Sequence, residues 1–361
     1  MNEIGIYELL RQAVDKLGLG FSATKTGVEI KLLKKIFTEE DARMWLHLTD
    51  KLEAPEDIAK RANMDTEQAA AKLADLNEKG LTFVKRKGDR VYYAAIPFAH
   101  GLYEHQLKKM DKELAQLFYD FFNAEQIQKG PEVVRDPEIA MTHRTIPVNE
   151  PVKISQPVAT YDDAREIIKS KKRIAVCDCV CAVVQERIGK SCDKPKEVCL
   201  HFDFYAENSV EQGIGRWITQ EEALEVLDKA EESGLIHQPA NMINPESLCN
   251  CCADCCCELG VIKKLGSPAV FIPSNYFAQV NAKLCNACEE CMDRCPMDAI
   301  GIGTEDVAEI NRENCIGCGL CINTCPVEAL MLVVKPENEQ QEPPPRNLLH
   351  KGSDEYESGL Q

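Results

Sequence analysis

Apolar residues recur with a helical period along the first third of the chain. In residues 1–39 their spacing of three and four positions predicts an amphipathic helix that ends at the glycines following it. We expect this helix to pack against the rest of the protein or to dock onto a partner. It carries Ile6, Leu9, Leu10, Val14 and Leu17, with Gly18 and Gly20 after it.

Residues 40–128 continue this pattern and then change period. Three helical stretches, EEDARMWLHLTD, APEDIAKRAN and DTEQAAAKLADLNEKG, are followed by LTFVKR and RVYYAAI, in which apolar and polar residues alternate on either side of Gly88. Alternation across a glycine turn predicts a β-hairpin. Residues 102–128 return to a helical period, and the apolar stripe of this long helix indicates either a core or a homodimer interface.

The order of three helices and a hairpin resembles a winged-helix domain, a likeness of pattern rather than of motif. The resemblance implies that the third helix would enter the major groove of DNA while the hairpin touches phosphate. The third helix has a mixed charge that includes Glu67, Asp75 and Glu78, and only the hairpin residues 85–90 are mainly basic. We therefore expect a protein-docking module, and DNA binding is the disfavoured alternative.

Three further segments follow. Residues 129–160 contain five prolines, which predict an extended linker, and we assign no role to His143 within it. Residues 161–274 form a middle domain in which DDAREIIKSKK predicts a helix and RIAVCDCVC a buried strand. Residues 336–361 are polar, acidic and proline-containing, so we expect a disordered tail.

The composition restricts the function. The chain has 361 residues, enough for several domains, and its 42 basic and 59 acidic residues give a net charge of -17. This charge favours a basic protein partner over nucleic acid. The 19 cysteines are odd in number and clustered, and no secretory signal is visible, which favours metal-binding thiolates in the cytoplasm over a disulfide scaffold. No apolar run reaches membrane-spanning length, so we expect no membrane insertion.

Eight cysteines fall in two identical frames near the C-terminus. Both frames read Cys-x2-Cys-x2-Cys-x3-Cys-Pro, the spacing that binds a cubic iron-sulfur cluster. Three thiolates spaced by two residues can ligate three corners of one cube, whereas the fourth, turned away by the proline, reaches the other cluster. Two [4Fe-4S] clusters with crossed ligation are therefore predicted. The frames consist of Cys285, Cys288, Cys291 and Cys295, and of Cys315, Cys318, Cys321 and Cys325.

Residues 275–335 resemble a bacterial-type ferredoxin with two [4Fe-4S] clusters. Four thiolates also suit zinc, but two Cys-Pro frames at one fixed period favour clusters. The first frame is acidic and the second is glycine-containing and apolar, so we expect the two clusters to differ in potential. The resemblance implies one cube on Cys285, Cys288, Cys291 and Cys325, and a second on Cys315, Cys318, Cys321 and Cys295.

The other eleven cysteines lie in the middle domain. Cys249, Cys252 and Cys255 repeat the Cys-x2-Cys-x2-Cys spacing without a following Cys-Pro, so a fourth thiolate has to come from elsewhere. We expect one or two further clusters here, and the alternatives are structural thiols or a zinc site. The adjacent residues 255–257 point in different directions and cannot all bind one metal. An earlier group, which either supplies the fourth thiolate or holds its own cluster, consists of Cys179, Cys181, Cys192 and Cys199.

These patterns predict an α+β multidomain protein with a winged-helix-like N-terminal domain, a cysteine-rich α/β middle domain and a C-terminal ferredoxin-like 2[4Fe-4S] domain. The whole is similar to uncharacterised iron-sulfur proteins of anaerobic bacteria. No nucleotide-binding glycine motif is visible, so electrons must arrive through redox partner proteins. We expect an electron-transfer component of an oxidoreductase system rather than a self-contained enzyme. The alternatives are a redox-sensing winged-helix regulator and an iron-sulfur reductase with catalysis in the middle domain.

Overall fold

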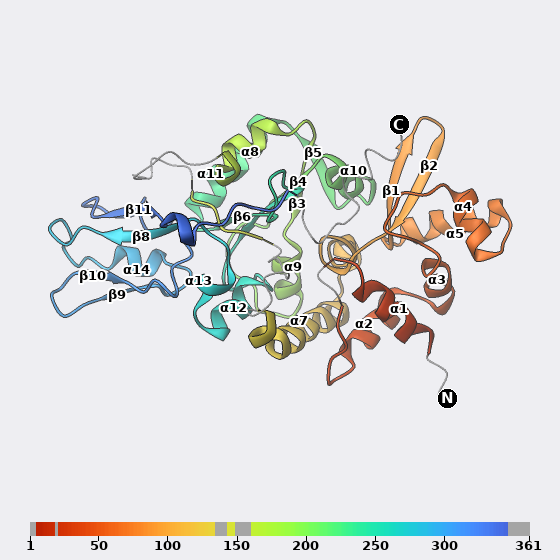
Figure 1. The fold of residues 1–361 in the computed structure, drawn as a ribbon, viewed down its shortest axis with the longest axis horizontal. Helices are drawn as coiled ribbons and strands as arrows, with labels where there is room; N and C mark the ends of the chain where they lie inside the picture. The colour runs from red at the N-terminus through yellow and green to blue at the C-terminus, as the bar shows by residue number, and fades with distance from the viewer. Residues whose placement is uncertain (1–4, 19–20, 134–142, 149–159, 346–361) are drawn as a thin grey trace.

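The computed structural model describes residues 5–18, 21–133, 143–148 and 160–345. In Figure 1 the N-terminal helices lie at one end of the molecule, a five-stranded sheet lies in the middle, and the two small C-terminal sheets lie at the other end. No helix within the described ranges is long and apolar enough to span a membrane.

The N-terminal part consists of five helices followed by a hairpin. Thr38 and Asp41 form a capping box at the start of the helix Glu39–Trp45. The Asp65 carboxylate accepts hydrogen bonds from two backbone N–H groups at the start of the helix Thr66–Glu78. The order of three helices and a hairpin agrees with the prediction, while the winged-helix likeness remains a prediction. The elements are α1 (Ile6–Asp15), α2 (Val28–Ile36), α3 (Glu39–Trp45), α4 (Pro55–Ala62), α5 (Thr66–Glu78), β1 (Thr82–Lys87) and β2 (Arg90–Ala95).

The helix expected over residues 102–128 is interrupted in the structure. Met110 has an extended backbone, and the Asp111 carboxylate accepts a hydrogen bond from the Leu114 N–H at 2.7 Å, which starts a new helix. Phe118 and Phe121 of that helix are fully buried in the core of the N-terminal part. The segment comprises η1 (Phe98–Leu102), α6 (Tyr103–His105), η2 (Leu107–Lys109) and α7 (Lys112–Val133).

The middle part is built on an antiparallel sheet with strand order β5-β3-β4-β7-β6. Leu200 and Phe202 of β4 pack in the same core as helices α8 and α11, whereas His201 between them contacts Ser209 of α10, so helices cover both faces. The strands are β3 (Ile174–Asp178), β4 (Glu197–Phe202), β5 (Gly215–Ile218), β6 (Ile236–Pro239) and β7 (Ser247–Cys251), and the helices are η3 (Thr160–Asp162), α8 (Ala164–Ser170), α9 (Val180–Arg187), α10 (Asp203–Glu211), α11 (Gln220–Glu232), α12 (Leu259–Leu265) and α13 (Pro268–Phe271).

The C-terminal part has an internal twofold repeat. β8 (Tyr276–Val280) pairs with β11 (Leu330–Val334), β9 (Ile300–Ile302) pairs with β10 (Ala308–Ile310), and α14 (Glu290–Arg294) lies within the first cysteine frame. The short helix η4 (Glu337–Glu339) lies in the segment expected to be disordered. The backbone of this segment contacts Asn275 and Ile243 through residues 341 and 344, and its remainder from residue 346 lies outside the described residues.

The β1–β2 hairpin packs on α10 of the middle part. Phe83 makes an edge contact with Phe204 at 5.5 Å between ring centroids, and the Val84 N–H donates to Asn208 Oδ1 at 2.8 Å. Lys85 forms an ion pair with Glu207 at 2.6 Å. Arg86 forms one with Glu211 at 2.5 Å. Two of the basic residues that would touch phosphate in a winged helix are therefore paired with carboxylates of the same chain.

We expect Asn208→Ala to destabilise the protein by about 1–3 kcal/mol, because it leaves the buried N–H of Val84 without an acceptor. The Asn208 amide is fully buried and also donates to the Phe204 carbonyl at 3.0 Å. Anaerobic urea unfolding of the full chain measures the change. The control is Glu211→Gln, which alters an exposed ion pair and should cost at most about 1 kcal/mol. Equal losses for both variants would contradict the buried hydrogen bond as the main contact.

Candidate metal centres

The two cysteine frames of the C-terminal part surround two separate cavities. Each cavity is lined by three cysteines of one frame and the last cysteine of the other, which is the crossed grouping that the ferredoxin resemblance implies. Thiolates on several sides of a cavity are the donor set that a cubic cluster requires, so these residues fit the cofactor. We call them the first ligand set, with Cys285, Cys288, Cys291 and Cys325, and the second ligand set, with Cys295, Cys315, Cys318 and Cys321.

Backbone N–H groups reach the sulfur atoms in a pattern that follows the internal repeat. Ala278 donates to Cys315 Sγ at 3.4 Å and Ala308 donates to Cys285 Sγ at 3.4 Å. In the same way the N–H groups of Ala299 and Ala329 donate to Cys295 and Cys325, at 3.3 and 3.2 Å. Such hydrogen bonds favour the thiolate form and tune the potential of a bound cluster.

The two ligand sets differ in exposure. Cys288 of the first set is exposed, whereas three cysteines of the second set are buried. Burial raises the pKa of Cys318 to about 12, so its thiolate needs the positive charge of a metal. Gly317 has a φ of +68°, and a Cβ there would lie 2.2 Å from the Tyr276 carbonyl oxygen, so only glycine allows the second frame to approach β8 this closely.

Comparison with known proteins supports this assignment for the C-terminal part. Residues 278–333 match the family model of the 4Fe-4S dicluster domain. This segment is a 4Fe-4S ferredoxin domain. No curated protein and no solved structure matched the chain. We refer to the segment below as the dicluster domain.

Seven cysteines of the middle part lie in contact, six in a closed ring of thiols and the seventh beside one of them. Cys179 contacts Cys181 and Cys199, and Cys199 contacts Cys249. The ring closes through Cys251, which contacts both Cys249 and Cys256, and through Cys181, which contacts Cys256. Cys257 lies 3.5 Å from Cys181 between sulfur atoms. We call this group the thiol ring: Cys179, Cys181, Cys199, Cys249, Cys251, Cys256 and Cys257.

The thiol ring holds more thiols than His143, the one basic side chain that contacts it within the described part of the chain, can balance. Contacts between neighbouring thiols raise the pKa of Cys199, Cys251 and Cys256 well above the usual thiol range and lower the pKa of their partners Cys181 and Cys249 well below it. So many buried thiols cannot ionise together unless a cation compensates them. The ring therefore has the donor set of a metal site, in which metal binding would supply that charge.

Four residues to which the sequence analysis gave no role lie at the thiol ring or next to it. His143 contacts Cys249, and its Nδ1 atom lies 2.7 Å from Glu258 Oε2. Its Nε2 atom lies 3.1 Å from Nε2 of His100. The Tyr103 hydroxyl contacts Cys181. No sequence signal could have marked His143, because it reaches the ring from the proline-rich segment before the middle domain.

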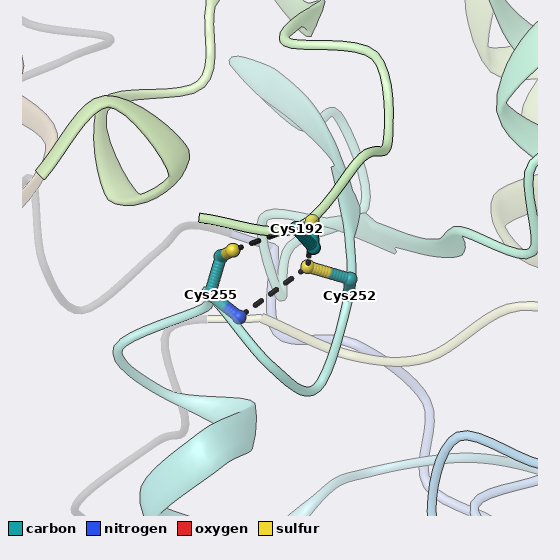
Figure 2. A group of neighbouring side chains, drawn as sticks. All are labelled: Cys192, Cys252 and Cys255. Carbon is teal, nitrogen blue, oxygen red and sulfur yellow. Dashed lines mark hydrogen bonds between the residues drawn. The ribbon is translucent and has the colours of Figure 1, made fainter. Parts of the chain in front are cut away.

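Cys192, Cys252 and Cys255 form a second and more compact group, which we call the thiol trio (Figure 2). The Cys192 sulfur lies 3.7 Å from that of Cys252 and 3.4 Å from that of Cys255, and the Cys255 N–H donates to Cys252 Sγ. Hydrogen bonding from Cys255 lowers the pKa of Cys252 to about 6, so this thiol ionises readily.

The structure thus regroups the middle cysteines relative to the sequence patterns. Cys252 and Cys255 join Cys192, while Cys249 of the same predicted arc belongs to the thiol ring. Cys192 in turn is separated from its predicted companions, which are all in the ring: Cys179, Cys181 and Cys199. Cys177 belongs to neither group. Its sulfur lies 3.3 Å from His201 Nδ1, and burial raises its pKa to about 12, which indicates a structural thiol.

A large cavity adjoins both groups of thiols. It lies between α7, α9 and α12, opens to solvent, and has about 1040 Å³ of empty space including its mouth, compared with about 330 and 350 Å³ measured in the same way for the two ligand sets. Its walls include Tyr103, Tyr119 and Phe122, and its remaining lining includes Cys181, Cys255, Cys256 and Cys257. The cavity is therefore about three times larger than the space around either ligand set.

We expect anaerobically purified protein to contain more iron and acid-labile sulfide than the roughly eight of each that two cubes account for. Cys181→Ser should lower both by about four, because it removes a thiolate of the ring. Cys177→Ser is the matched control and should leave both unchanged. Iron and sulfide analysis of the three proteins decides the matter, and a wild-type content of about eight would contradict a cluster in the thiol ring.

Proposed function

We propose that this protein transfers single electrons between a redox partner protein and its own cysteine-rich centre. The observation that carries the proposal is a shared apolar core. Cys295 and Cys318 of the second ligand set pack in the same core as Cys251 and Cys256 of the thiol ring. The two donor sets are thus separated by packed side chains rather than by solvent.

The chain's own residues shape this connection. When bound by four cysteines, a [4Fe-4S] cluster accepts and donates one electron and offers no open position to a substrate. Met297, Ile316 and Leu320 are buried between the dicluster domain and the middle part, where they exclude water. Because water is excluded between the two donor sets, electron transfer between them would require little solvent reorganisation. Electrostatic interactions between charged groups are also stronger there than in water.

The first ligand set faces the partner in this proposal. Cys288 is exposed, and Leu284 beside it is an exposed apolar residue. Glu289, Glu290 and Asp293 surround the same loop and are exposed to solvent. An apolar contact rimmed by carboxylates suits a partner with a basic surface, because opposite charges speed the encounter.

The contacts of the hairpin weigh against the alternative of a DNA-binding regulator. Lys85 and Arg86, two of the basic hairpin residues that would approach phosphate, are paired with Glu207 and Glu211 of α10. Binding phosphate there would require these ion pairs to break. We therefore propose that the N-terminal part docks onto the middle part of its own chain.

We expect the double variant Glu290→Lys and Asp293→Lys to slow electron transfer to a basic c-type cytochrome by about tenfold or more at low salt, because it reverses the charge that steers the encounter. Stopped-flow oxidation of the reduced protein measures the rate. The control is Glu225→Lys, an exposed charge change on α11, which should have little effect. Equal rates for all three proteins would show that the partner does not use this face.

The large cavity supports a second candidate, reduction of a small molecule at the thiol ring. Cys181, Cys256 and Cys257 line the cavity together with the Tyr103 ring, so a bound molecule would touch the donor set directly. The aromatic wall suits an apolar ligand. Reduction of an organic disulfide is one such reaction: the disulfide takes up two electrons from the dicluster domain and two protons, and its S–S bond breaks to give two thiols.

We expect hydroxyethyl disulfide to reoxidise the dithionite-reduced protein, and Asn123→Trp to slow this reaction because the indole fills the cavity beside Tyr119. Asn123 lines the cavity, and its side-chain amide donates a hydrogen bond to the Tyr119 carbonyl rather than to a cysteine of the thiol ring. Reoxidation by the basic cytochrome serves as the control and should be unaffected by the variant. Failure of the disulfide to oxidise the wild-type protein would count against this reaction.

A further inference from the structure

The thiol trio is more compact than the donor sets that fit a cluster. Its three sulfur atoms all lie within 4.8 Å of one another, and within the described residues no other group of three Cys, His, Asp or Glu side chains meets that criterion. The two ligand sets of the dicluster domain therefore do not meet it, although they belong to a domain that binds [4Fe-4S] clusters. The ligand sets provide an internal standard for the spacing around a cube, and the trio is tighter than this standard.

Three thiolates this close together match the requirements of a single ion. A zinc ion lies about 2.3 Å from each thiolate sulfur, which places tetrahedral ligands within about 4 Å of one another. Iron atoms at different corners of a cube, in contrast, hold their terminal thiolates further apart because the cluster lies between them. Metal binding would ionise the three thiols together.

The positions of the three cysteines also suit a metal site. Cys192 lies in the loop between α9 and β4, whereas Cys252 and Cys255 lie in the loop between β7 and α12 (Figure 2). Neither loop has regular structure at these positions, so an ion would join two segments that are 60 residues apart. Cys255 also lines the large cavity, which leaves a fourth position for water or for a molecule bound in the cavity.

We propose that Cys192, Cys252 and Cys255 bind one zinc ion in a site separate from every iron-sulfur cluster of the protein. The site has three thiolate ligands and an open fourth position. Zinc is the expected metal because it is soft enough for thiolates, accepts tetrahedral geometry and binds such sites more tightly than ferrous iron. The proposal does not depend on the electron-transfer function.

Metal analysis of the anaerobically purified full-length protein tests the site. We expect about one zinc per chain in the wild type, because the chain has one such set of three thiolates. Cys192→Ser should lose most of this zinc and keep its iron and acid-labile sulfide. The matched control is Cys199→Ser in the thiol ring, which should lose iron and sulfide and keep its zinc.

Zinc-edge X-ray absorption of the wild type gives a second test that needs no variant. It should show about three sulfur neighbours near 2.3 Å and one lighter atom. Either of two results would overturn the proposal: a wild-type zinc site with only nitrogen and oxygen neighbours, or a Cys192→Ser protein that loses about four irons and four sulfides, as a cube ligand would. Absence of zinc from the wild-type protein would overturn it as well.

Discussion

The structure depends on the burial of many thiols in one place. Seven cysteines contact one another in the thiol ring, and three more form the trio beside it. A buried thiolate is costly without a neighbouring positive charge, and several together repel one another. Metal ions remove both costs at once, and the free energy of metal binding then becomes part of the free energy of folding. The rest of the middle part is arranged so that strand ends and loops from distant segments meet at this point.

This constraint explains why the parts of the chain are not independent. Cys181 and Cys257 pack against the N-terminal core, Cys252 and Cys255 belong to the core under α11, and Cys251 and Cys256 belong to the core shared with the dicluster domain. Three apolar cores therefore meet at the thiols. The hairpin on α10 and the extended segment 143–148, whose backbone bonds both His237 and Cys318, reinforce these contacts. A perturbation of the thiol ring should consequently affect all three parts.

The dicluster domain could be predicted from sequence because its ligands come from a local repeat with a fixed spacing. The grouping of the middle cysteines could not be predicted from sequence, and β7 shows the reason. Cys249 and Cys251 lie on this strand, where residues two apart share a face, so both point to the thiol ring. Cys252 follows the end of the strand and turns toward Cys192. The Cys-x2-Cys-x2-Cys spacing brings three thiols around one cluster only where the chain forms a loop or a short helix. Whether it forms a strand instead depends on pairing with strands that are far away in the sequence.

The same reasoning shows what was predictable about the run of adjacent cysteines. Neighbouring side chains in a chain diverge, so residues 255–257 were not expected to serve one metal. In the structure Cys255 joins the trio, whereas Cys256 and Cys257 contact Cys181 in the thiol ring. All three line the large cavity. One short stretch therefore connects the trio, the ring and the cavity, and a molecule bound in the cavity would touch cysteines of both thiol groups. The middle part thus places its thiols at the edge of a large cavity, whereas the cysteines of the dicluster domain line only the two smaller cavities of their own ligand sets.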